Sequence, residues 1–156
     1  MLTSDAKIYN TLIQAKKDGN KLLNKFHIQY PSKDAVAQES NSIIVAVVSS
    51  EPNEELLDAT EYRDLIEVLI VTKIRDYDRA VRVIKTVTRE IIQLLKLSDE
   101  FEVRPIVRNI SPEYNSDFVL SRGHVLVEVL SSIDTFDDTE EYEKVCEILV
   151  EDIEIE

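Results

Sequence analysis

Residues 65–96 read LIEVLIVTKIRDYDRAVRVIKTVTREIIQLLK. The first part is rich in β-branched and apolar residues and predicts a strand over Tyr62–Thr72, covered on both faces. Asp76 then offers an N-cap, and the apolar residues that follow recur at spacings of three and four, typical of an amphipathic helix over 77–96. The apolar stripe of this helix consists of Ala80, Val83, Ile84, Val87, Ile91, Leu94 and Leu95. A strand followed directly by such a helix indicates a sheet with helices packed on it.

A second helix is predicted at the start of the chain, from about Asp5 to Lys25, with Ser4 as its N-cap. Its apolar positions are Ile8, Leu12, Ala15, Gly19, Leu22 and Phe26. Gly19 lies on this stripe, so either it permits close approach of another backbone or the helix breaks there. After a polar loop, the run at 42–49 predicts another buried strand, which Glu51-Pro52-Asn53 ends. A long loop is predicted next, and we expect its residues Leu56 and Leu57 to pack on the core or to contact a neighbouring molecule.

Two more strands are predicted beyond the helix at 77–96. The segment Phe101–Arg108 alternates in polarity, and Pro105 within it indicates an edge strand or a bulge, because proline cannot donate to a ladder. After a polar connection of about ten residues, the segment Arg122–Leu130 would pair antiparallel with it. Arg104, Arg108 and Arg122 gather on these two segments, and their ion pairs with Glu102 and Glu128 are favoured over a nucleic-acid-binding platform, which would need interleaved aromatic residues.

The predicted fold is α+β: a mixed or antiparallel four-strand sheet with two long helices packed on one face, followed by an acidic C-terminal extension. The domain covers residues 1–132 and the extension residues 133–156. The extension holds eleven acids against Lys144, so it carries most of the net charge of −13. Its apolar residues suit either a helical face or an alternating strand, and both remain open.

Composition narrows the classes of function. The chain has 156 residues, 44% hydrophobic and 31% charged, which fits one globular domain without a membrane span or a signal sequence, and we expect it to stay in the cytosol. With one cysteine, no internal disulfide forms, and two glycines are too few for a phosphate-binding loop. His27 and His124 lack partners at metal-ligand spacing, and no acid-x-Lys element of a nuclease accompanies the acids on the strands. We therefore expect a protein that is not an enzyme and holds no metal or cofactor.

The order of elements resembles that of the tail terminator proteins of long-tailed bacterial and archaeal viruses. The resemblance is one of layout and covers residues 4–132: a helix, a strand, a long loop, a strand running into the helix that ends near Leu95, and two β segments over Phe101–Leu130. It implies a ring, usually of six subunits, that ends the tail tube and joins the tail to the head, with DNA passing through the lumen. The acidic extension is a departure from this layout.

The resemblance also implies partners: further copies of the chain, the tail tube protein and a connector or neck protein on the head side. It places the protein in the virion, assembled in the host cytoplasm. Subunit contacts in such a ring cover exposed strand edges and apolar loop residues. The candidates for these contacts are Leu56, Leu57, Pro105, Ile153 and Ile155.

Three other interpretations are open. The first is a different neck component, such as a head-side stopper or connector, which would also form rings but attach to the portal. The second is a cytosolic, non-catalytic protein-interaction domain whose acidic tail engages a basic partner. The third is a hydrolase or nuclease, which the missing motifs argue against.

Overall fold

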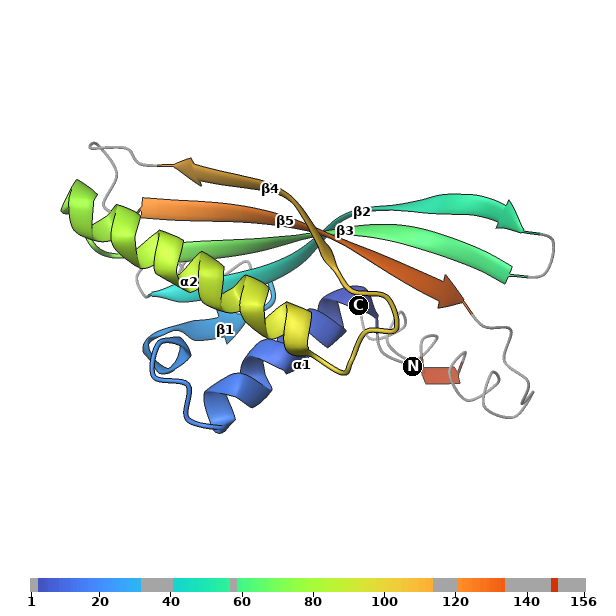
Figure 1. Cartoon of the computed structure of the whole chain (residues 1–156), viewed down its shortest axis with the longest axis horizontal. Coiled ribbons are helices and arrows are strands. Elements are labelled where there is room, and N and C mark those ends of the chain that lie inside the picture. Colours follow the sequence, from blue (N-terminus) through green and yellow to red (C-terminus); the bar gives the residue numbers. More distant parts are fainter. Residues whose placement is uncertain (1–2, 32–40, 57–58, 114–120, 134–146, 149–156) are drawn as a thin grey trace.

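A five-strand mixed sheet with two helices on one face forms the core of the fold (Figure 1). The computed structural model describes residues 3–31, 41–56, 59–113, 121–133 and 147–148. The strands are β1 (His27–Gln29), β2 (Ser42–Leu56), β3 (Ala59–Thr72), β4 (Ile106–Glu113) and β5 (Ser121–Ile133). The helices are α1 (Ser4–Lys17) and α2 (Tyr77–Leu97), with a short 3-10 helix, η1 (Leu23–Lys25), before β1. The α+β class is confirmed.

The strands lie in the order β1-β2-β3-β5-β4. β2 and β3 form an antiparallel hairpin, β5 pairs antiparallel with β3 and with β4, and β1 pairs parallel with β2. The prediction of four strands is wrong because it omits β1. This strand has three residues, too few to show an alternating pattern, and it pairs only with Ser42–Ile44.

One hydrophobic core fills the space between the sheet and the two helices. Ile8 and Leu12 of α1 and Ile84, Val87 and Ile91 of α2 pack in it. The strands contribute Ile43, Val45, Ile66, Val68, Ile70, Val125, Val127 and Val129. Because these residues alternate along each strand, they lie on one face of the sheet, and the opposite face has no helix over it in the described structure.

The first helix is shorter than predicted. α1 ends at Lys17, and Gly19 follows with a φ of 90°, a left-handed conformation that glycine adopts without steric cost. Of the two alternatives, the break is therefore correct, and a Cβ at Gly19 would meet nothing within 4 Å. Ser4 is the first residue of the helix rather than its N-cap, which is Thr3. The prediction for α2 is confirmed, with Asp76 at the N-cap position.

The strand predicted to end near Ser49 continues to Leu56, so the predicted long loop is wrong. β2 passes through Pro52 while paired with β3, with irregularities between Val47 and Ser49 and between Pro52 and Glu54. Pro52 is tolerated because β1 does not extend beside it, so no outer strand requires its missing N–H. We call the part of the sheet formed by residues 49–56, 59–64 and 129–133 the arm. In Figure 1 the arm extends beyond the ends of both helices.

The last two strands pair as predicted, but β4 begins later. It starts at Ile106, directly after Pro105, and ends at Glu113, so the segment 101–105 is not a strand, and Pro112 lies within β4 rather than in the connection. β4 is an edge strand with a bulge between Val107 and Asn109. The acidic extension lies outside the described residues except for Ile133, which ends β5, and 147–148, which are helical. None of the helices in the described part of the chain has the length and apolar character that a membrane crossing requires.

Candidate functional site at the sheet edges and the arm

Both lateral edges of the sheet are open. On one side β1 pairs with β2 only at Ser42–Ile44, so the outer edge of β2 from Val45 to Leu56 has no strand partner within the described residues. On the other side β4 has no outer neighbour in the described part of the chain. Unpaired N–H and C=O groups on such edges are templates for pairing with another chain. The molecule therefore presents two different edges on opposite sides of one sheet.

Apolar side chains are exposed along both edges. On β2, Val47 and Val48 are 53% and 57% exposed. On β4, Ile106 and Ile110 are 44% and 48% exposed. Isolated exposed apolar residues are ordinary, but pairs of β-branched residues beside unpaired backbone groups are typical of surfaces buried on association. These four residues form the apolar part of the candidate site.

Irregular backbone limits how another strand can add to these edges. β2 contains two irregularities and Pro52, and β4 contains one bulge and Pro112. Bulges and prolines on edge strands interrupt regular pairing and oppose indefinite strand addition. A neighbouring chain would therefore meet each edge through short runs of backbone and through side chains, which favours a defined contact.

A carboxylate at the base of the arm joins three elements. Asp64 of β3 accepts hydrogen bonds from Ser4 of α1, Ser50 of β2 and Ser131 of β5, the first and last over 2.5 and 2.9 Å. Partial burial of the Asp64 carboxylate would raise its pKa, but the three hydroxyl donors together outweigh this effect and lower the pKa below its ordinary value. This cluster fixes the start of α1 against the strands where the arm leaves the helix-covered part.

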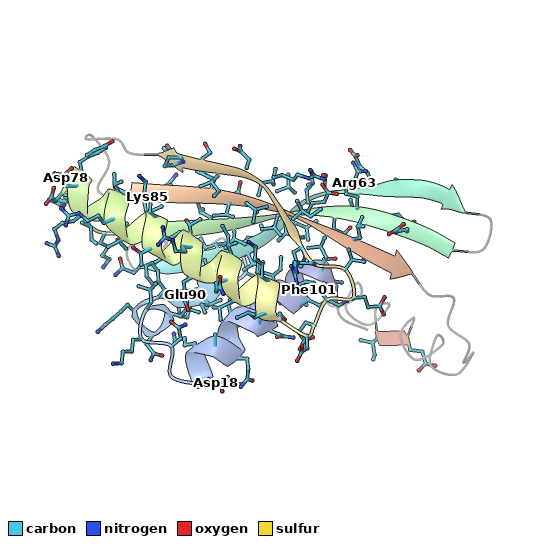
Figure 2. The ribbon with its side chains drawn as sticks, in the orientation of Figure 1. Asp18, Arg63, Asp78, Lys85, Glu90 and Phe101 are labelled. Carbon is cyan, nitrogen blue, oxygen red and sulfur yellow. The ribbon has the colours of Figure 1, made fainter. Side chains whose placement is uncertain are left out.

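A second carboxylate lies on the helix-free face of the sheet. Glu128 of β5 is buried between Arg63 of β3, at 3.3 Å from Nε to Oε1, and Arg108 of β4, which donates from Nε to Oε2. The hydrogen bond from Arg108 lowers the pKa of Glu128 and outweighs the effect of burial, with further attraction from both arginines. Of the arginines and glutamates predicted to form ion pairs, Arg108 and Glu128 do so. Figure 2 shows Arg63 at the base of the arm.

Further along the same face, His124 lies between two glutamates. Its Nδ1 is 3.5 Å from Glu67 of β3 and its Nε2 is 3.3 Å from Glu113 of β4. These contacts link the three strands on the helix-free face. Among the residues that the structure describes, no three His, Cys, Asp or Glu side chains are grouped as ligands of a metal ion. His27, at the start of β1, is exposed.

The residues predicted for subunit contacts are only partly described. Pro105 is half-buried and directly precedes the edge strand β4, and Leu56 ends β2. Leu57, Ile153 and Ile155 lie outside the described residues. All five stay predictions. Sequence reasoning missed the exposed pairs Val47–Val48 and Ile106–Ile110, because their exposure follows from the strand order, which leaves these parts of β2 and β4 without an outer strand in the described residues.

Neither a known protein family nor a curated protein matches this chain. We therefore infer a function from the open edges of the sheet, the arm and the distribution of charge. The described structure presents two dissimilar edges, one on each side of the sheet, and two polar clusters at the base of the arm.

Proposed function

We propose that this chain is a structural virion protein that assembles into a ring of six copies, which ends the tail tube of a long-tailed virus and joins the tail to the head. The proposal is supported by one observation above others: within the described residues, the sheet has two different open edges on opposite sides, each with exposed β-branched residues. A chain with such edges can use one for the preceding copy and the other for the next.

The two edges differ in sequence and direction, so contact between them is heterologous. Repetition of a heterologous contact gives a closed ring when the rotation between subunits closes, and a filament when it does not. The bulges and prolines on β2 and β4 oppose indefinite strand addition, which supports the closed form. In this arrangement the outer part of the arm, beyond the start of α1, has no described helix over it and is available for contact with a partner above or below the ring.

The charge of the chain suits a passage for DNA. The net charge is −13, and negative charge repels phosphate, so a lumen lined by such a protein would let DNA pass without holding it. The proposed partners are the tail tube protein on one side of the ring and a head-side connector or neck protein on the other. The protein acts by shape, in the assembled virion, after assembly in the host cytoplasm.

The direct test uses tubes assembled from the cognate tail tube protein. Full-length chain carrying a small gold label is added to growing tubes, and electron microscopy records tube lengths and label positions. We expect one label cluster at one end of each tube and an arrest of growth. Binding along the tube wall, or growth at an unchanged rate, would overturn the proposal. Labels on portal rings but not on tubes would assign the chain to another neck position instead.

A further inference from the structure

The outward face of α2 carries a row of positive charges in an otherwise acidic protein. Between residues 73 and 97 the chain has seven cations and three acids, a local charge of +4 against the total of −13. Six of the cations form what we call the basic stripe: Arg75, Arg79, Arg82, Lys85, Arg89 and Lys96. All six are exposed.

The basic stripe is narrow and lies opposite the core. At 100° per residue the five members within α2 fall within about 120° of the helix circumference, centred roughly opposite the buried residues Ala80, Ile84 and Ile91, and Arg75 directly precedes the helix. Glu90, the acid nearest the middle of α2, is turned toward the turn between α1 and η1, where its Oε1 accepts a hydrogen bond from Asn20 over 2.8 Å. Figure 2 shows Lys85 and Glu90 on different sides of α2. Asp78, in the first turn of α2, falls within the same sector as the stripe, so this face has six cations and one acid.

Within the described residues the ion pairs are formed by Arg63, Arg108 and His124, and none involves a member of the basic stripe. An apolar residue completes the surface, since Leu97, at the end of α2 and on the same side as the stripe, is 70% exposed. Positive charges beside an exposed leucine fit a partner segment that combines acids with apolar residues.

We infer that the basic stripe binds the acidic C-terminal segment of a second copy of this chain. Residues 134–156 contain eleven acids and Lys144, and the acids are interspersed with apolar residues that include Ile153 and Ile155. From Arg79 to Lys96 the stripe is about 26 Å long, and 23 residues span about 34 Å even as a helix, so the segment covers the whole stripe. The contact neutralises two surfaces of opposite charge, each of which would repel the same surface of another copy.

This inference deepens the proposed function, because it rests on neighbouring copies, and it names the charged contact between them. Carbodiimide coupling of the full-length chain tests it, since the reagent joins a lysine amine to a carboxylate in direct contact. Unlabelled and ¹⁵N-labelled chains are mixed in equal amounts, refolded together, coupled and digested, and the linked peptides are identified by mass spectrometry. We expect Lys85 and Lys96 linked to acids of residues 134–156, in mixed-isotope pairs, and several-fold less linkage at 0.5 M salt.

Two variants make the test specific. Arg82→Glu combined with Arg89→Glu should reduce linkage of the segment several-fold, whereas Lys85→Arg should remove the Lys85 link and leave the Lys96 link. Absence of these links, links to acids outside residues 134–156, or links within one isotope only would overturn the inference. If the Glu variant instead lost affinity for a DNA duplex in fluorescence anisotropy and changed no links, the stripe would be a nucleic-acid surface. Rings without the links would refute this inference alone, whereas a monomer would refute the proposed ring as well.

Discussion

Asp64 on β3 and Glu128 on β5 lie at the same level of the sheet but on opposite faces. Their neighbours in register are Val129 for Asp64 and Leu65 for Glu128, so the two carboxylates are one residue pair apart. Asp64 accepts hydrogen bonds from three serine hydroxyls on the helix side of the sheet, and Glu128 forms ion pairs with two arginines on the other side. Through these contacts the two carboxylates connect α1, β2, β3, β4 and β5 at the base of the arm.

Replacing Asp64→Asn should lower the free energy of unfolding by about 1–2 kcal/mol, because three hydroxyl groups lose a charged acceptor. Chemical denaturation measures this loss, with Asp99→Asn, in an exposed turn, as the matched control. The loss should also depend on pH. Because the folded state lowers the pKa of Asp64, its contribution is complete above the ordinary value of 3.8 and disappears as pH falls through the folded value. A difference between the two proteins that persisted unchanged at pH 2 would contradict this assignment.

Replacing Glu128→Gln should loosen β4 more than it lowers global stability. The substitution removes the charge that holds Arg63 and Arg108, and both arginines are about half exposed, so we expect a global loss of only about 1 kcal/mol. Hydrogen exchange measured by mass spectrometry should show faster exchange in Ile106–Glu113, with β2 unchanged. Glu102→Gln, exposed and outside the sheet, is the control. Equal protection of β4 in both variants would show that Glu128 does not hold this strand.

Replacing Gly123→Ala should destabilise the fold by about 1–3 kcal/mol through overpacking. A Cβ at this position would lie 2.5 Å from Cγ2 of Ile84, because α2 passes directly over Gly123. Thermal unfolding of both single variants and of the double variant Gly123→Ala/Ile84→Ala measures the coupling. The cost of the alanine should be smaller once Ile84 is truncated, whereas strictly additive losses would exclude the predicted clash.

Lysine at either edge of the sheet should prevent assembly without unfolding the chain. Val48→Lys charges the β2 edge and Ile110→Lys charges the β4 edge, and both side chains are exposed in the single chain. Mass photometry should find each variant mainly as small species, whereas Val103→Lys, exposed but outside both strands, should assemble normally. Because each edge variant keeps one intact edge, their mixture should give dimers and no ring. Rings formed by that mixture would show that the contact does not join β2 to β4.

The amino-acid sequence predicts the elements whose apolar residues are periodic. α2 is predicted almost to the residue because its buried apolar residues recur at spacings of three and four: Ala80, Ile84, Val87, Ile91 and Leu95. The pairing of β4 with β5, and with it the ion pair of Arg108 and Glu128, also follows from local pattern. These features depend on neighbours in sequence or on one antiparallel pairing.

Features that depend on distant partners were not predictable. β2 runs through Pro52 because its outer edge is open, a fact of topology that no local pattern contains. β1 is a strand only because its three residues pair in parallel with Ser42–Ile44 of β2, a contact that the sequence of β1 does not indicate. Asp64 meets Ser4 and Ser131, which lie 60 and 67 residues away, so nothing near Asp64 in the sequence marks it as the centre of a cluster.

The most direct test of the ring is the mass of the full-length chain in solution at low ionic strength. Native mass spectrometry of the purified protein should give one closed oligomer at a small integer multiple of 17.9 kDa, with six copies expected, and negative-stain images should show annular particles. A strictly monomeric protein, both alone and with its tail tube partner present, would contradict the account.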